Sequence, residues 1–502
     1  MRPSASAFSS CADEETRSAL RGTAYPDGAR GLRTGLSVTG TLGGGGGVVA
    51  SLGRARSVVD AQPVSPAANN PTQASATAIP NDVMLVEMTP IGLLVGNYPF
   101  VREAAVVEAP KVHAPLRFET VVSEEGLAAL EDRWDALVRA MPRPSPFLLH
   151  CWVLEWWRHY GEGCRLAVEV AFRGDELVGA LPLITFSHRG LRVGTFIGAR
   201  QSALADALIA EGEGRDLVEA LADRAMASEH DYVDLFGLSA EGRLAAMDGP
   251  RRLELFQRIE APVMDLADGW EAAFRAKTNS RKRSHYKHRR RQLAELGELE
   301  VVHARTLHEL EPALEEAFRI HELRWRGRPD GSGFVTETGK QFTRAVQPGL
   351  AELDASRIVL MRIDGRPVAF SWYLLIERHA FLHRLAFDPA YGRFSPGMVN
   401  ALDSLELAAE EGATRVEFLG GAERYKLEFA DRFEPLHLGI GLPGSARGRS
   451  VVAARAGWLR LRGRSKSSAL ARKLYYGTAS ARRRLTRQRD VLRPSGVRRL
   501  GD

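Results

Sequence analysis

Apolar and polar positions predict strands in two stretches of the chain that have the same form. Residues 167–186, AVEVAFRGDELVGALPLITF, contain two apolar runs around Gly174-Asp175, and residues 357–376, RIVLMRIDGRPVAFSWYLLI, contain two around Asp364-Gly365. A Gly and Asp pair between apolar runs is typical of a β-hairpin. Later strands are predicted at 230–238 and 413–421. In each copy a third strand and a helical stretch lie between the hairpin and the late strand. The offset of roughly 180 to 190 residues predicts two copies of one α/β unit.

Helical spacing appears in the second copy. In residues 307–325, the apolar positions Leu310, Leu314 and Phe318 recur every four residues and predict a helix. A strand is predicted at 380–387, and a helix after it begins near Ser395 and ends at Gly412. Residues 279–291, NSRKRSHYKHRRR, predict a helix that is basic on all sides and is therefore not mainly core.

The chain divides by composition into four parts. Residues 1–115 are rich in Gly, Ala, Ser and Pro, with five successive glycines at 43–47, and we expect disorder there because too little apolar surface is available for burial. The first copy is predicted at 116–258 and the second at 259–445. A basic tail follows at 446–502. The fold class is therefore α/β (α+β), with two tandem units between a disordered segment and a basic tail.

Composition and charge narrow the classes of function. The chain has 502 residues, of which 44% are hydrophobic, and neither a transmembrane helix nor a signal peptide is predicted. Three cysteines without metal-ligand or disulfide spacing fit a reducing cytoplasm, and the histidines form no metal motif, so no metal is expected. The net charge of +6 is concentrated in 280–291 and the tail. Such localised charge favours an anionic partner, although solvated helix faces explain it equally well.

Ser395-Pro396-Gly397 raises a question about the helix that it opens. Ser395 suits an N-cap and Pro396 suits the first helical position. Gly397 needs another reason, because glycine inside a helix costs about 0.5–1 kcal/mol relative to alanine. Close approach of the backbone to a bound anion would supply one, since the free N–H groups of a helix N-terminus form a phosphate site. Plain helix starting is the alternative.

The corresponding place in the first copy provides an internal comparison. There the sequence reads AEGEGRDLVEALADRA, and Glu211 and Glu213 stand where the anion would lie. Their negative charge would repel phosphate. The sequence therefore predicts an anion site in the second copy and none in the first.

Four stretches, within a region covering about 116–445, resemble a known family. They are SPFLLHCWVLEWW (145–157), NSRKRSHYKHRRR (279–291), FDPAYGRFSPG (387–397) and FLGGAERYKLEF (418–429). Together with the predicted strand order they resemble the GNAT acyltransferase superfamily, and within it the cellulose-biosynthesis (CelD/BcsL-type) acetyltransferases. The double unit is similar to that of FemAB-type peptidyltransferases. The turn RFSPGM departs from the usual Gln/Arg-x-x-Gly-x-Gly/Ala pattern of the superfamily.

The resemblance implies an acyl-CoA donor, most simply acetyl-CoA, bound at the turn that opens the helix. Transfer to an amine or hydroxyl needs a base for the acceptor and a proton donor for the leaving thiolate. Each candidate also has a structural alternative, such as a core aromatic, a solvated cation or an ordinary strand histidine. The donor-binding candidates are Phe387, Arg393, Phe394, Ser395, Gly397, Met398 and Val399; the catalytic candidates are Tyr425, Lys426, Glu417, His383 and Asp388; the acceptor-binding candidates are Glu322, Trp325, Arg326, Arg281 and Tyr286.

Three functions fit these features. The first is a cytoplasmic acyl-CoA-dependent N- or O-acyltransferase acting on a small molecule or a glycan, in exopolysaccharide, cellulose or envelope-glycan biosynthesis. The second is a FemAB-like transferase that uses aminoacyl-tRNA, and the third is a non-enzymatic accessory protein of a membrane synthase. The tail favours peripheral contact with an anionic membrane, with disorder as the alternative. Its apolar residues are Trp458, Leu459, Leu461, Leu474, Tyr475 and Tyr476.

Overall fold

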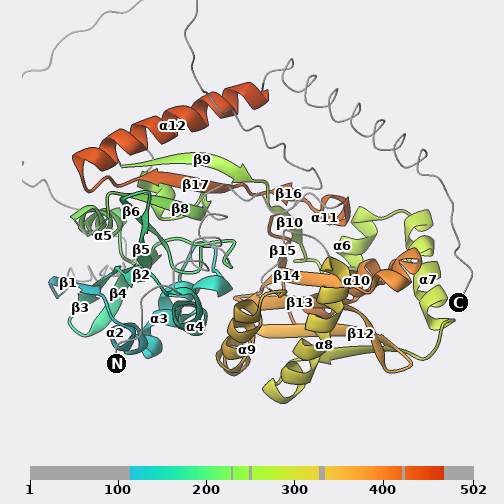
Figure 1. Ribbon diagram of the computed structural model, residues 1–502. Helices are drawn as coiled ribbons and strands as arrows, with labels where there is room; N and C mark the ends of the chain where they lie inside the picture. Colours follow the sequence, from blue (N-terminus) through green and yellow to red (C-terminus); the bar gives the residue numbers. More distant parts are fainter. Residues whose placement is uncertain are drawn as a thin grey trace, which may run out of the picture. The chain divides into compact units, whose positions relative to one another are not determined.

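The computed structural model describes residues 114–199, 201–227, 230–247, 252–326, 334–420 and 424–467. The predicted disordered segment, apart from its last two residues, lies outside these ranges, as do Leu474, Tyr475 and Tyr476 of the tail. Both copies of the predicted α/β unit lie inside them (Figure 1).

The first copy forms two sheets rather than one. The predicted hairpin at Gly174 is confirmed: β3 and β4 pair antiparallel on either side of it. One sheet has the order β1-β3-β4-β7, and the other has β2-β5-β6-β8-β17-β9. Three strands, β5 to β7, follow the hairpin where the sequence predicts one. The elements are β1 (Leu116–Val121), α2 (Glu124–Ala128), α3 (Glu131–Arg139), η1 (Pro146–Leu148), α4 (His150–Tyr160), β2 (Cys164–Leu166), β3 (Val168–Arg173), β4 (Glu176–Leu181), β5 (Leu183–His188), β6 (Leu191–Phe196), β7 (Leu208–Ile209), α5 (Arg215–Ala227), β8 (Tyr232–Ser239), η2 (Leu244–Met247) and β9 (Leu253–Ile259).

The second copy has one seven-stranded sheet, in the order β11-β12-β13-β14-β15-β10-β16. Asp364 and Gly365 both have positive φ, 50° and 72°, in the predicted hairpin turn, as a tight two-residue turn requires. The predicted helix at 307–325 is confirmed at both ends. The elements are β10 (Pro262–Asp265), α6 (Trp270–Lys277), α7 (Ser280–Ala294), β11 (Leu299–Ala304), α8 (Leu307–Trp325), α9 (Glu337–Glu352), β12 (Ser356–Ile363), β13 (Arg366–Ile376), β14 (His379–Phe387), η3 (Pro389–Phe394), α10 (Pro396–Glu410), β15 (Arg415–Glu417), α11 (Arg424–Phe429) and β16 (Arg432–Phe433).

Helices cover both faces of this sheet, as the alternation along β13 shows. Phe370, Trp372 and Leu374 pack in one core cluster with residues of α8 and α9, whereas Tyr373 packs in another with residues of α10. Successive strand residues point to opposite faces, so α8 and α10 lie on different sides. On the α10 side, Asn400 of α10 accepts a hydrogen bond from Ser371 Oγ at 2.7 Å.

The parallel pair β14 and β15 has the feature that positions the site. α10 connects the two strands, and their pairing covers only three positions, ending at Phe381 opposite Glu417. Beyond that point no further pairs join them, so the two strands separate. The first copy repeats the arrangement, since β6 and β8 are parallel and α5 lies between them in sequence.

The second copy contributes one strand to a sheet of the first copy. Strand β10, which follows β9 after two residues, pairs with β15 and β16 in the second copy's sheet. Strand β17 (Leu436–Gly441) returns to the first copy and lies between β8 and β9 (Figure 1). The predicted bounds of 116–258 and 259–445 therefore do not follow the strand pairing at the C-terminal side.

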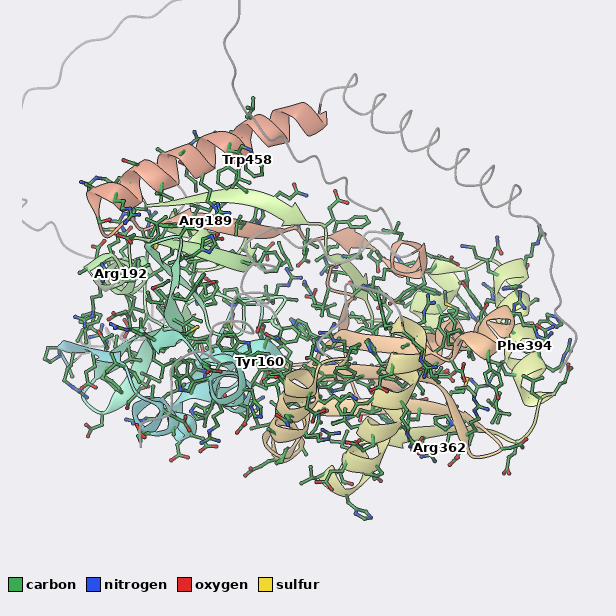
Figure 2. The ribbon with its side chains drawn as sticks, viewed as in Figure 1. Tyr160, Arg189, Arg192, Arg362, Phe394 and Trp458 are labelled. Carbon is green, nitrogen blue, oxygen red and sulfur yellow. The ribbon has the colours of Figure 1, made fainter. Side chains whose placement is uncertain are left out.

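The tail begins as α12 (Ala446–Ser467), which packs on the first copy. Val452 and Ala456 are buried there, and Arg455 pairs with Asp234 of β8. Trp458, labelled in Figure 2, is about half exposed at 55%, and Leu461 is 68% exposed. Among the described helices, none combines the length and apolarity needed to cross a membrane.

Candidate functional site

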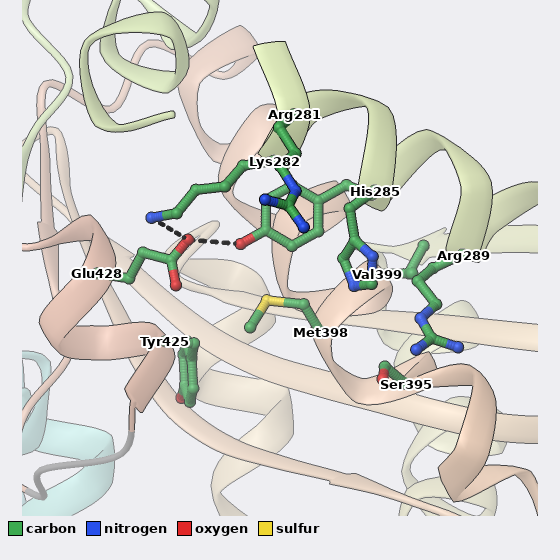
Figure 3. A pocket seen from close by; sticks show the side chains of 10 residues that line it. Arg281, Lys282, His285, Arg289, Ser395, Met398, Val399, Tyr425 and Glu428 are labelled. Carbon is green, nitrogen blue, oxygen red and sulfur yellow. Dashed lines mark hydrogen bonds and ion pairs between the residues drawn. The ribbon is translucent and has the colours of Figure 1, made fainter. Parts of the chain in front are cut away.

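A cavity of about 400 Å³ lies where α7, the start of α10 and α11 meet (Figure 3). Its size falls in the range of small-molecule sites. Six of the residues predicted from the sequence line it: Arg281, Tyr286, Ser395, Met398, Val399 and Tyr425. Four further lining residues, Lys282, His285, Arg289 and Glu428, were not predicted.

One wall of the cavity is the basic face of α7. Asn279 caps this helix, because its side chain accepts a hydrogen bond from Lys282 N at 2.9 Å. Two of the basic side chains are neutralised: Lys282 pairs with Glu428 at 2.9 Å, and Arg290 pairs with Asp403 of α10 at 2.5 Å. Arg281 and His285 are exposed at the cavity. The wall is therefore cationic, as a site for an anionic group requires.

The start of α10 forms a second wall. Ser395 adopts a left-handed conformation with φ 59° and ψ 46°, and its side chain makes no capping hydrogen bond, so the predicted N-cap role of the side chain is wrong. The residue instead turns the chain between η3 and α10, and its carbonyl accepts hydrogen bonds from Met398 N and Val399 N. Arg289 donates to the carbonyl of Arg393 at 2.8 Å and so ties the turn to α7.

Helix α11 supplies the third wall. Glu428 accepts a hydrogen bond from Tyr286 Oη at 2.7 Å and forms an ion pair with Lys282, and Figure 3 marks both contacts of Glu428 with dashed lines. Tyr425 lies one turn earlier on α11 and packs edge-on against Phe418, with ring centroids 6.1 Å apart. The spacing of three residues from Tyr425 to Glu428 places both on one helix face, a signal by which the sequence could have revealed Glu428.

Gly397 has a packing reason that the sequence did not show. A β-carbon there would lie 2.7 Å from Cδ1 of Phe387, too close for any real contact. The predicted close approach is therefore made by an aromatic side chain of the protein, which is sufficient to explain the glycine without a ligand.

We expect Gly397→Ala to destabilise the protein by about 1–3 kcal/mol, the usual cost of overpacking. Gly392→Ala is the matched control, since its β-carbon would meet the same ring, at Cε2, at an ordinary 3.6 Å. Urea unfolding measures both variants. Phe387→Leu in the Gly397→Ala background should recover most of the loss; equal effects of the two alanines would contradict the steric explanation.

Four of the predicted donor-binding residues do not line the cavity: Phe387, Arg393, Phe394 and Gly397. Phe387 packs against Gly397 and below the guanidinium of Arg324, 4.7 Å from its ring centroid. Arg393 is exposed, and its guanidinium lies 4.5 Å over the ring of Phe394, which is labelled in Figure 2. These side chains shape the turn before α10 from outside the cavity.

Three of the predicted catalytic residues have partners within the protein that account for them. Lys426 is buried and donates to the carbonyl of Gly420 at 2.8 Å. Asp388 caps η3 by accepting from Ala390 N at 2.9 Å, and it pairs with Arg366. Glu417, the third of these catalytic candidates, is fully buried.

Glu417 is held by two arginines. Arg143, from the first copy, donates to both of its carboxylate oxygens, at 2.9 and 2.5 Å, and Arg415 donates to Oε1 at 2.7 Å. Both of its carboxylate oxygens are occupied by guanidinium donors, and the contact with Arg143 joins the two copies. The carboxylate is poorly suited to take a proton from an acceptor.

His383 lies away from the 400 Å³ cavity, on β14 next to the point where β14 and β15 separate. The register shifts around it, with Trp372 opposite Arg384 and Tyr373 opposite Leu382, so His383 is the extra residue of a β-bulge. Its ring packs among Phe147, Trp152 and Trp372. Burial, and the charge of Arg384, hold the pKa of His383 well below its usual value, so the ring is neutral at pH 7.

The predicted acceptor residues on α8 lie on the last turns of that helix. Glu322 pairs with Lys340 of α9, and Trp325 stacks on His321 with centroids 5.9 Å apart. Arg326 is exposed at the C-cap. None of the three lines the 400 Å³ cavity, whereas the other two acceptor candidates, Arg281 and Tyr286, do.

Among the described residues no group of three or more His, Cys, Asp or Glu side chains is placed to hold a metal ion. The 400 Å³ cavity has a cationic wall on α7 and is also lined by Tyr425, which lies close in sequence to the end of β15. A neutral histidine stands on β14 where the two strands part. Such a site can hold a phosphate-bearing ligand and offer proton donors to a reaction between the strands.

Comparisons with known proteins agree with this geometry in part. Residues 280–427 match the family described as acetyltransferase (GNAT) domain. No curated protein matches the chain.

Similar solved structures include a conserved protein from Bacteroides thetaiotaomicron (14% identity, 64% of this chain and 99% of that chain, TM-score 0.45). They also include FemX (12% identity, 64% and 96%, TM-score 0.43) and a tandem GNAT protein from the clavulanic acid biosynthesis pathway (16% identity, 65% and 98%, TM-score 0.35). These TM-scores are too low to assign a function. The family match covers residues 280–427, and the parallel strands β14 and β15, whose pairing ends at Phe381, lie within that range.

Proposed function

We propose that the protein is an acyltransferase that binds acyl-CoA in the 400 Å³ cavity and transfers its acyl group, most simply acetyl, to an amine or hydroxyl. The observation that carries the proposal is the cavity itself, which joins the N-terminus of α10 to the cationic face of α7 inside the GNAT domain. Arg281, His285 and Arg289 would contact the phosphates of the donor, with the N–H groups at the start of α10.

The reaction balances without a metal or a redox step. The nitrogen or oxygen of the acceptor attacks the thioester carbonyl, the new C–N or C–O bond forms, and the C–S bond breaks. The CoA thiolate takes one proton, which the hydroxyl of Tyr425 supplies, and the acceptor loses one to a base. Glu417 and Asp388 are engaged elsewhere, so His383 is the remaining base among the predicted residues. Its depressed pKa makes it a neutral but weak base.

A role in polysaccharide or envelope-glycan biosynthesis is part of this proposal and rests on the sequence resemblance. So does a peripheral position at an anionic membrane through the tail. The aminoacyl-tRNA alternative is favoured by one observation, the number of exposed basic residues on α7. RNA binding through that helix would weaken steeply with salt, so a steep loss of binding with salt would favour this alternative.

Acetyl-CoA at about 100 times its dissociation constant is expected to stabilise the full chain by about 2.7 kcal/mol. Arg281→Glu should abolish the stabilisation, because a carboxylate would face the phosphates. Lys287→Glu is the matched control, since Lys287 is exposed on the same helix but does not line the cavity. Thermal unfolding with and without ligand measures both variants. Stabilisation that survives Arg281→Glu would place the donor elsewhere.

A further inference from the structure

A second, much smaller cavity lies beside His383. It has room for about 10 Å³, the volume of one water molecule or one oxygen atom. Its walls come from both copies, so the first copy, which lacks an anion site, has a part in forming it. The first copy contributes Trp152, Tyr160 and Gln201, and the second contributes Phe334, Gly339, Phe342, Thr343, Trp372, His383 and Arg384.

Three lining side chains have a buried nitrogen atom without a hydrogen-bond partner among the described residues: Trp152 Nε1, His383 Nδ1 and Arg384 Nε. Trp152 is 1% exposed, so water outside the protein cannot reach it. A buried polar group left unpaired costs about 1–3 kcal/mol, and such groups call for an explanation. Because the indole N–H and the arginine Nε–H are donors only, the missing partner is an acceptor atom, such as an oxygen.

Two nearby tryptophans show that an indole N–H without a hydrogen-bond acceptor is not a general feature of this core. Trp372, in the same cavity wall, donates to Ser356 Oγ at 3.0 Å. Trp156, on the same helix as Trp152, donates to Gln201 Oε1 at 2.7 Å. Only the indole that borders the cavity from α4 lacks an acceptor within the described part of the chain.

The cavity is also bordered by a positive charge, that of Arg384, for which the described residues provide no ion-pair partner. The guanidinium of Arg384 lies 5.8 Å over the ring of Phe334, and no acidic side chain of the described residues forms an ion pair with it. Several buried or half-buried arginines among the described residues do have an acidic partner, as Arg143 has Glu417 and Arg362 has Glu316. A partly buried cation without a counter-charge favours an anionic ligand.

We propose that this cavity binds a carboxylate oxygen of the acyl acceptor, held by Trp152 Nε1 and Arg384. The proposal rests on the proposed acyltransferase function and deepens it, because it names the chemical class of the acceptor. The cavity admits only the oxygen, so the body of the acceptor lies at the mouth, which Tyr160 and Arg384 border as half-buried side chains. An amino acid and a sugar acid share this chemistry.

The test uses the indole N–H signal of Trp152 in the full-length protein labelled with ¹⁵N-tryptophan. Trp152→Phe identifies the signal. Sodium acetate and sodium glucuronate, which carry the carboxylate, are expected to move it, and glucose is not. The signal of Trp372 serves as the internal reference, since its N–H is already bonded to Ser356. A larger response to glucuronate than to acetate would favour a sugar acid; the reverse, together with a response to N-acetylglycine, would favour an amino acid.

Arg384→Met should weaken carboxylate binding by about tenfold or more, the effect of losing a charge-assisted hydrogen bond. Arg324→Met is the matched control, because Arg324 also stacks on an aromatic ring, that of Phe387. A Trp152 signal that responds to no carboxylate, or that responds equally to glucose, would overturn the proposal and assign the cavity to a bound water. The measurement needs no acyl-CoA, and Arg281→Glu should leave the response of the Trp152 signal to carboxylates unchanged. A failure of this proposal can therefore be distinguished from a failure of the proposed donor site.

Discussion

Replacing Arg143 with methionine is expected to destabilise the protein by about 3 kcal/mol, because removing one partner of a buried ion pair leaves an uncompensated charge. Arg143 and Glu417 are 5% and 0% exposed and form a two-fold hydrogen-bonded pair. The second arginine on Glu417, Arg415, keeps the loss at the lower end of the range for such pairs.

Urea unfolding at pH 7 measures this loss, and Arg139→Met provides the matched control. Arg139 also joins the first copy to the second, through Glu377 at 2.9 Å, but that pair is 41% and 46% exposed. An exposed pair contributes about 0–1 kcal/mol. The double variant Arg143→Met with Glu417→Met should recover part of the stability, since it leaves no buried charge without its partner. Similar losses for the Arg143 and Arg139 variants would show that burial does not govern this contact.

Replacing Tyr425 with phenylalanine is expected to lower kcat by about 100-fold, the lower end of the effect of a positioned general acid. The ring and its edge-on contact with Phe418 remain in this variant, so stability and acetyl-CoA affinity should change little. A loss confined to kcat identifies an interaction made in the transition state rather than in binding.

Release of the CoA thiol, followed with a thiol reagent, measures the rate, first with water and then with carboxylate-bearing amines and alcohols as acceptors. Tyr391→Phe is the control, because Tyr391 lies on η3 in the same domain but does not line the cavity. If Tyr425→Phe retains the full rate, the hydroxyl is a spectator and the thiolate takes its proton from water.

The sequence predicts those parts of the fold that are determined by residues close together in the chain. The turns at Gly174 and Asp364, the helix at 307–325 and the helix ending at Gly412 depend on neighbours within a few positions. The same applies to the site, where Arg281 and Tyr286 lie on a helix with evident charge and Met398 and Val399 follow a recognisable helix start.

Contacts between distant segments could not be predicted in this way. Strand alternation in the sequence would point Glu417 away from Val416 and Phe418, and nothing near it in the sequence reveals an arginine 274 positions earlier. In the sequence, Gly397 suggests close contact with a ligand. In the structure, the side chain of Phe387, ten residues earlier, packs against it. Ser395 has the residue type of a cap but the backbone of a left-handed turn. In each case the deciding partner is supplied by the tertiary fold.

Strand β17 has a consequence for how the chain is made. Strands β8 and β9 both pair with β17 and are not joined to each other, so the sheet of the first copy stays incomplete until residues 436–441 have left the ribosome. By then the whole second copy has been synthesised. During that interval two strand edges are open to other chains. Synthesis of the second copy therefore has to be complete before those edges are closed within the same chain.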